Sequence, residues 1–310
     1  MTPRAWALFA AMGALWGLPY LLIKVAVSEV DPAVVVFVRL GLSAVVLIPI
    51  AVAAGALKHV LRDRWRRVGI VAAVGIVLPF LLIGYGEQHI TSSLAALLVA
   101  SDPLFIVLLA LAIDRSERAG GTRLIGLVVG LVGVAALFGL DVGGDTYLLL
   151  GGAMVLLASL CYALSALLVK GLADVPRVGS VSATVTVAAV LIAPLAVTRL
   201  PATMPDPGVV VAMLALALLC TALAYVLYFS LIVEAGATRA SLITYMNPAV
   251  AVLFGVLILS EPLTLGTIVG FALILIGCAL ATGLLHAPRR SRQAHRIAST
   301  SPELVEGRSS

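Results

Sequence analysis

The sequence predicts an all-α integral membrane protein whose ten transmembrane helices form two inverted five-helix repeats. Three observations lead to this class. Apolar residues make up 62% of the 310 residues and charged residues only 11%, and the mean hydropathy is +1.17, whereas a soluble domain carries about 25% charged residues. Long apolar segments follow one another along the whole chain. A proline–glutamate–glycine pattern occurs once in each half of the chain.

The repeated pattern consists of a proline, a glutamate and three glycines. Its first copy is Pro103, Glu117, Gly126, Gly133 and Gly139, and its second copy is Pro248, Glu261, Gly270, Gly277 and Gly283. The glutamate-to-glycine separations are 9, 16 and 22 residues in both copies. A duplicated unit explains this match, so we expect one repeat over 5–140 (helices 1–5) and a second over 149–286 (helices 6–10).

A helix needs about 20 apolar residues to cross the hydrocarbon core. Ten segments meet this need, at about 5–27, 33–54, 68–86, 92–113, 123–140, 149–170, 180–198, 208–232, 238–259 and 264–286. Each half contains an odd number of spans, so the two halves are expected to have opposite orientations in the membrane.

Lysine and arginine residues predict the orientation of the chain. If the amino terminus is cytoplasmic, 17 of the 20 basic residues lie on the cytoplasmic side, and only Lys24, Arg39 and Arg199 lie toward the other side. This distribution predicts a multi-pass protein of the inner (plasma) membrane with both termini in the cytoplasm. Residues 287–310 are polar and charged, which predicts a disordered cytoplasmic tail. The net charge of +5 lies mostly in short loops and this tail, so we expect no nucleic-acid partner.

Asp102 and Asn247 occupy matching positions in predicted spans 4 and 9, and a proline follows each. Pro103 and Pro248 cannot donate a backbone hydrogen bond, so each is expected to bend its helix and to free one carbonyl oxygen. A charge at mid-membrane costs about 2.5–3.5 kcal/mol on insertion scales, so such residues usually face a cavity or stay protonated. Two interpretations stay open. The two side chains satisfy the freed carbonyls, or Asp102 binds a proton or sets charge selectivity while Asn247 contacts a solute.

Three further charged residues lie in or beside the spans. Arg39 lies about six residues into span 2, where it either extends to the headgroups or contacts a substrate carboxylate or Asp102. Lys24 is nearer to a helix end, so extension to the headgroups is the simpler interpretation. Glu87 ends span 3, and we interpret it as part of an ordinary polar loop.

Several aromatic side chains of the spans are candidate cavity residues, with an interfacial belt as the alternative explanation: Trp16, Tyr20, Tyr85, Tyr162, Tyr225, Tyr228 and Tyr245. Trp16, Tyr162 and Tyr225 lie more than one turn from any predicted helix end, so for these three the cavity and the belt stay equal alternatives. Pro19, beside Gly17, is expected to bend or unwind span 1.

Small residues recur at the start of spans 5 and 10. Gly126 and Gly130 open the first of these spans, and Gly266 and Gly270 open the second. This spacing allows close helix contact, either within one chain or between two chains of a homodimer.

Motifs of catalysis are missing from the sequence. There is no Gly-x-x-x-x-Gly-Lys-Ser/Thr loop for nucleotides, no His-Glu-x-x-His and no Gly-x-Ser-x-Gly. The three cysteines have no metal-ligand spacing. We therefore expect no catalytic, cofactor-binding or metal-binding residues.

The stretch Ala14-Leu-Trp-Gly-Leu-Pro-Tyr-Leu-Leu-Ile-Lys24 resembles the first-span signature of EamA-type proteins in the drug/metabolite transporter superfamily. Residues Thr238 to Pro248, with Leu259-Ser-Glu-Pro262 and Gly270 to Gly277, are similar to the second half of the same repeat. The resemblance implies two inverted EamA repeats around a central cavity lined mostly by spans 1, 3, 4, 6, 8 and 9. It also implies export or exchange of small metabolites such as amino acids, nucleosides or drug-like amphiphiles.

These observations together predict a secondary transporter that exports a small organic solute by alternating access. We expect no enzyme activity, a monomer or homodimer in the lipid bilayer, and protons as a candidate second substrate. Two alternatives stay open. A lipid-modifying membrane enzyme would need clustered acid–base or metal residues, and a non-transporting sensor would usually carry a sizeable soluble domain.

Overall fold

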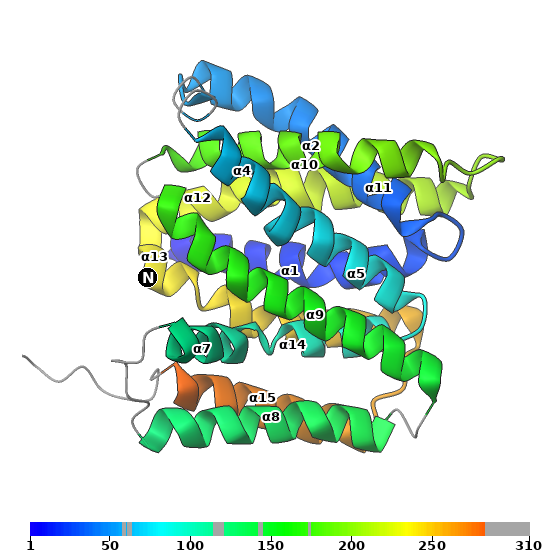
Figure 1. Ribbon diagram of the computed structural model, residues 1–310, viewed down its shortest axis with the longest axis vertical. Helices are drawn as coiled ribbons and strands as arrows, with labels where there is room; N and C mark the ends of the chain where they lie inside the picture. The colour runs from blue at the N-terminus through cyan, green and yellow to red at the C-terminus, as the bar shows by residue number, and fades with distance from the viewer. Residues whose placement is uncertain (58–59, 61–63, 114–120, 142–144, 173–174, 283–310) are drawn as a thin grey trace, which may run out of the picture.

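The computed structural model describes residues 1–57, 60, 64–113, 121–141, 145–172 and 175–282. Within these ranges the chain is a bundle of helices without β-strands (Figure 1). The first half contains α1 (Pro3–Ala26), α2 (Pro32–Ala53), α4 (Trp65–Ala72), the π-helical turn η1 (Ala73–Val77), α5 (Leu78–Glu87), α6 (Ser92–Val99), α7 (Asp102–Ile113) and α8 (Gly121–Asp141). The second half contains α9 (Thr146–Val169), the 3₁₀ turn η2 (Lys170–Leu172), α10 (Arg177–Val197), α11 (Pro207–Ala217), the π-helical turn η3 (Leu218–Leu223), α12 (Ala224–Ala235), α13 (Ala237–Ala240), α14 (Ile243–Leu259) and α15 (Leu265–Ala281).

Eight helical stretches of the described chain are long and apolar enough to cross a membrane. They correspond to predicted spans 1 to 8, and their outer surfaces carry exposed apolar side chains such as Val45, Val190 and Val211. α14 and α15 occupy the positions of spans 9 and 10 but have only 17 residues each. The all-helical membrane class is therefore confirmed, and the count of ten spans stays a prediction for these two helices. The predicted tail, 287–310, lies outside the described residues.

Several helices begin at a short polar residue followed by proline. Asp31 Oδ1 accepts a hydrogen bond from the backbone N–H of Ala33 (2.9 Å), which caps α2. Asp206 caps α11 in the same way, and Thr2 caps α1. The following proline lacks an N–H that would be unpaired in the first turn, so these pairs set the starts of their helices.

Contacts between the two halves follow a two-fold pattern. α2 packs on α10, and α8 packs on α15, so these helices pair with their own counterparts. α1 packs along α14, and correspondingly α9 packs along α6 and α7. α5 packs on α9, and correspondingly α11 and α12 pack on α1. Exchanging the halves leaves the first two contacts unchanged and converts the others into one another, as expected for two related repeats.

α1 and α9, the first helices of the two halves, begin at opposite ends of the bundle. Thr2 Oγ1 donates a hydrogen bond to Glu234 Oε1 (2.6 Å) beside the start of α1. At the other end of α1, Lys24 Nζ donates to the carbonyl of Ile90 (2.7 Å). Gly151, in the second turn of α9, packs against Ile90 as well. The start of α9 therefore lies beside the end of α1, which is the antiparallel relation that inverted halves require.

Four described glycines of the repeated pattern, Gly126, Gly133, Gly270 and Gly277, lie in the contact between α8 and α15, which run together along one edge of the bundle (Figure 1). Gly126 and Gly130 pack on Gly277, and Gly133 packs on Gly270. Packing within one chain therefore accounts for these glycines, because each lets the two backbones approach closely.

Gly133→Ala is expected to lower the free energy of unfolding by about 1–3 kcal/mol, the usual range for overpacking. A Cβ atom there would lie 2.8 Å from the backbone nitrogen of Ile274 and 2.9 Å from the carbonyl oxygen of Gly270. Gly41→Ala in α2 is the control, because its added methyl group would meet no atom within 4 Å. Thermal unfolding of the purified variants measures both changes. Equal melting temperatures for Gly133→Ala and the unsubstituted protein would contradict the tight contact.

Two π-helical turns interrupt spans 3 and 8 at matching positions. Ala73, which begins η1, precedes Leu218, which begins η3, by the same 145 residues that separate Pro103 from Pro248. Each turn contains one residue more than an α-helical turn would, and such turns occur frequently at functional sites. The sequence analysis did not predict them, because the apolar pattern continues through both turns.

Candidate functional site

Five side chains from both halves lie close together inside the bundle, and we call them the central cluster: Tyr20 (α1), Arg39 (α2), Asp102 (α7), Tyr162 (α9) and Tyr225 (α12). The Tyr162 hydroxyl lies within electrostatic range of all four other members. The three tyrosines are surrounded by protein, yet each keeps part of its surface accessible. The cluster therefore brings a cation, an acid and aromatic rings together where the halves meet.

Arg39 is the buried cation of the central cluster, with 8% of its surface exposed. Its Nε atom donates a hydrogen bond to Thr221 Oγ1 in η3 (2.9 Å), and its Cζ atom lies 4.1 Å from the ring centroid of Phe80. Its burial inside the bundle differs from an extension to the headgroups. Within the described residues, no carboxylate oxygen lies within 4.0 Å of the guanidinium group, so Arg39 and Asp102 form no ion pair in this conformation. Arginine has five N–H donors, so the terminal nitrogen atoms remain for an anionic ligand.

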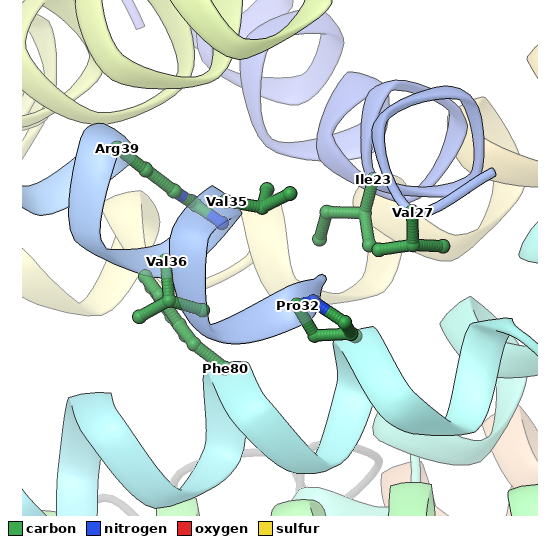
Figure 2. A pocket seen from close by; sticks show the side chains of 8 residues that line it. Ile23, Val27, Pro32, Val35, Val36, Arg39 and Phe80 are labelled. Carbon is green, nitrogen blue, oxygen red and sulfur yellow. The ribbon is translucent and has the colours of Figure 1, made fainter. Parts of the chain in front are cut away.

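A small cavity of about 10 Å³ lies beside Arg39, between α1, α2 and α5 (Figure 2). Arg39 is the one charged residue of its lining, which comprises Ile23, Val27, Pro32, Val35, Val36, Arg39, Phe80 and Gly84. A space of this size holds about one water molecule. An organic solute therefore needs a wider conformation to reach Arg39 from this side.

Aromatic rings of spans 1 and 8 pack against one another next to the central cluster. The Trp16 and Tyr228 rings lie 4.8 Å apart between centroids, and the Trp16 and Tyr225 rings meet edge to face at 6.3 Å. All three side chains are partly buried. Trp16 and Tyr228 thus extend the aromatic surface of Tyr225 toward the Thr2 end of α1.

Asp102 lies directly after a break in span 4. α6 ends at Val99 and α7 begins at Asp102, so the break precedes Pro103. Ser159 Oγ, from α9 in the other half, donates a long hydrogen bond (3.4 Å) to the Val99 carbonyl that Pro103 leaves free. A serine rather than Asp102 satisfies that carbonyl, and the buried Oδ1 atom of Asp102 has no hydrogen-bond partner.

Span 9 differs from span 4 in the position of its break. Asn247 and Pro248 lie within α14, and the interruption falls at residues 241–242, before the helix begins. The buried Oδ1 atom of Asn247 has no hydrogen-bond partner. A Cβ atom on Gly17 would lie 3.1 Å from the Asn247 carbonyl oxygen, so α1 and α14 touch here. α1 itself stays helical through Pro19, without the unwound segment that was one of the two expectations.

Two predicted cavity tyrosines lie apart from the central cluster. The Tyr85 hydroxyl donates to Asp31 Oδ1 (3.0 Å) beside the start of α2. The Tyr245 hydroxyl pairs with Thr282 Oγ1 (3.4 Å) beyond the end of α15.

Sequence analysis missed the role of Glu261, although this residue belongs to the repeated pattern. Its carboxylate accepts hydrogen bonds from the backbone N–H groups of Ser92 (2.7 Å) and Ser93 (2.9 Å) and from Ser93 Oγ (2.5 Å). A carboxylate at a helix N-terminus is stabilised by the free N–H groups and the helix dipole. Glu261 thus fastens the second half of the chain to the start of α6 in the first half. Its counterpart Glu117 lies outside the described residues.

Glu87 and Lys24 lie beside this contact. Glu87 is completely buried, and neither of its carboxylate oxygens has a hydrogen-bond partner. Lys24 Nζ donates to the backbone carbonyls of Glu87 and Ile90 instead. We call the end of the bundle where Lys24, Glu87, Ile90 and Glu261 lie the Glu261 end. No sequence signal distinguished Glu87 from an ordinary loop residue.

Comparison with known proteins gives the family. The family model described as "EamA-like transporter family" matches residues 4–139 and 149–283, nearly the whole of both halves. The chain belongs to the EamA-like transporter family. The resemblance stated from the sequence is confirmed, and the protein is a multi-pass membrane transporter.

Relatives agree with this family, and a solved structure shares the fold. An uncharacterized transporter of Archaeoglobus fulgidus is 23% identical over 88% of this chain and 97% of its own length. The uncharacterized inner membrane transporter YedA of Escherichia coli is 27% identical over 89% of this chain and 91% of its own length. A protein of known crystal structure, 20% identical, superposes with a TM-score of 0.64 over 92% of this chain and 99% of its own, which shows a shared fold.

Membership of the EamA-like family agrees with the chemistry of the site. Among the described residues, no group of three or more histidine, cysteine, aspartate or glutamate side chains is placed to bind a metal ion. The central cluster instead offers a cation, an acid and aromatic surfaces, which suit recognition of a polar organic molecule.

Proposed function

We propose that the protein is a secondary transporter of the inner membrane that exports a small organic solute by alternating access. The central cluster is the observation that carries this proposal, because side chains of both halves would contact one solute there. The inner-membrane location is supported by the relative YedA, which is named as an inner membrane transporter. The proposal includes repeats at 5–140 and 149–286 and cytoplasmic termini.

The charges of the central cluster favour a solute with a carboxylate and an amine, such as an amino acid. Arg39 has no carboxylate partner in the part of the chain that the structure describes, and a buried guanidinium group is stabilised by bidentate contact with one. Asp102 has an unpartnered oxygen that an ammonium group would pair with. Arg39 and Asp102 both lie near Tyr20, so a solute beside this ring would approach each of them. Nucleosides and drug-like amphiphiles remain the other proposed classes, since aromatic side chains suit their rings.

The relation between the halves supports the mechanism. Rocking of one half against the other exposes a central site to each side of the membrane in turn. The hydrogen bonds of Glu261 join the halves at one end of the bundle, so this conformation is proposed to be closed there.

A ligand screen followed by flux measurement tests the proposed function. Thermal unfolding of the purified protein is measured with amino acids, nucleosides and cationic amphiphiles. A ligand at 100 times its Kd stabilises a protein by about 2.7 kcal/mol, a readily measured shift. Stabilising ligands are then loaded, radiolabelled, into proteoliposomes. Passage of the unchanged compound across the membrane is the expected result, whereas its chemical conversion or a lack of flux for every stabilising ligand would contradict a transporter.

Asp102→Asn is expected to lower the affinity for amine-bearing solutes by about 10-fold or more, because a charge-assisted hydrogen bond contributes about 1.5–3 kcal/mol. Affinity for solutes without an amine should change little. Competition binding with matched compounds, one with and one without the amine, measures the difference. Equal losses for both compounds would show that Asp102 does not recognise the amine.

A further inference from the structure

Glu87 is a buried acid that the proposed solute site does not use. Its side chain has 0% exposure, and among the described residues neither carboxylate oxygen has a hydrogen-bond partner. Gly86, the residue before it, packs on the backbone of Gly151 in α9, so no space for bulk water lies on that side. The carboxyl group is thus enclosed between α5 and its neighbours at the Glu261 end.

The charged neighbours of Glu87 do not pair with it directly. Lys24 directs its ammonium group to two backbone carbonyls, and within the described chain it forms no ion pair within 4.0 Å. Glu261 adds a second negative charge nearby, and Arg39 lies farther off in the central cluster. Tyr20 in α1 is a further titratable group near the carboxyl group. α9 carries Tyr147, whose ring stacks on His89, and, farther along the helix, Cys161 and Tyr162.

An ionised carboxylate in this position would be very unfavourable. A buried charge without hydrogen bonds or a counter-ion costs several kcal/mol, and such groups usually become neutral instead. A metal ion would need oxygen ligands, but the nearby carbonyls of Glu87 and Ile90 already accept from Lys24. A proton on the carboxyl group removes the charge without any further ligand.

We propose that Glu87 is a proton-binding site that is occupied while the Glu261 end is closed and that releases its proton to water when this end opens. The connection from α5 to α6 forms the cover of the site. Lys24 binds this connection through the carbonyls of Glu87 and Ile90, and Glu261 binds the start of α6 from the other half. Separation of the halves at this end removes Glu261 from Ser92 and Ser93, and water then reaches the carboxyl group.

The role of this proton site rests on the proposed transport function, because release of the proton upon opening would couple solute flux to the proton gradient. It assigns the proton to Glu87 and leaves solute recognition to the central cluster. The pH dependence of flux should therefore disappear in Glu87→Gln and persist in Asp102→Asn.

Infrared difference spectroscopy of the full-length protein tests the site without any solute. The C=O stretching band of a protonated carboxyl group, recognised by its shift in D₂O, is expected at neutral pH and should be lost in Glu87→Gln. Glu87→Asp is measured in parallel and should keep a shifted band, so a folding defect of one variant does not decide the result. A band unchanged in both variants would overturn the proposal, as would loss of the band when Na⁺ is added at constant pH.

Glu261→Ala tests whether protonation of Glu87 depends on closure of the Glu261 end. In this variant the band should disappear at a lower pH than in the unsubstituted protein, because water reaches Glu87 more often. An unchanged titration would overturn the coupling between closure and protonation. If the band belongs to Glu87 but no solute is transported, the result supports the proton site and contradicts the proposed transport function.

Discussion

Glu261→Ala is expected to lower the free energy of unfolding by about 3 kcal/mol and to open the Glu261 end. The carboxylate accepts three hydrogen bonds from Ser92 and Ser93, and hydrogen bonds to charged groups contribute about 1.5–3 kcal/mol each before the chain readjusts. Without Glu261, the backbone N–H groups of Ser92 and Ser93 lose the acceptor that the second half supplies. Thermal unfolding measures the stability, and maleimide labelling of a cysteine at position 92 measures opening, which should become at least about 10-fold faster.

Glu29→Ala is the matched control for this prediction. The Glu29 carboxylate, in the connection between α1 and α2, also accepts a hydrogen bond from a distant backbone N–H group. The donor is Asp206 (2.9 Å), in the connection between α10 and α11, and this contact is exposed. Surface substitutions away from special features usually change stability by less than about 0.5 kcal/mol. Equal effects of the two variants would show that the Glu261 contact contributes no more than an ordinary surface contact.

Arg39→Gln is expected to weaken binding of a carboxylate ligand by at least about 100-fold. Removing one partner of a buried ion pair costs about 3–5 kcal/mol, because the other charge stays buried without compensation. Arg39→Lys should recover only part of the loss, since an ammonium group cannot form bidentate contacts or stack on Phe80 as a guanidinium group does. Calorimetric or thermal-shift titration with the ligand from the screen measures these affinities.

Arg199→Gln is the control for the loss of charge, because Arg199 is exposed beyond the end of α10. Its affinity for the ligand should equal that of the unsubstituted protein. Unchanged affinity in Arg39→Gln would exclude Arg39 from the solute site and would leave its burial to be explained by Thr221 and Phe80 alone.

Much of the fold could be predicted from the sequence because hydrophobicity and its breaks decide where membrane helices lie. The predicted span at 33–54 became α2 at Pro32–Ala53, and the pair Asp31–Pro32 sets its start. The close helix contact expected of Gly126 and Gly270 is confirmed, because small side chains at regular spacing have few other uses in a membrane.

The π-helical turns and the contacts of charged groups could not be predicted in the same way. The extra residue of η1 is apolar like its neighbours, so the hydropathy pattern does not reveal the π-helical turn. Tyr20 and Tyr85 look alike in sequence, yet only Tyr20 reaches the central cluster, because the crossing of α1 with the other half decides which ring faces inward. The burial of Glu87 likewise depends on the neighbours that α9 and α1 supply.

Thr221 connects Arg39 to the irregular turn in span 8. Its hydroxyl accepts from Arg39 Nε and donates to the carbonyl of Leu216, five residues earlier (2.9 Å). An incoming anion that draws the guanidinium group away would deprive this hydroxyl of its donor, while the surplus residue of η3 lets the turn change shape without breaking a regular helix. Binding of the solute would thus first change the backbone of the eighth span, at the π-helical turn where that backbone deforms most easily.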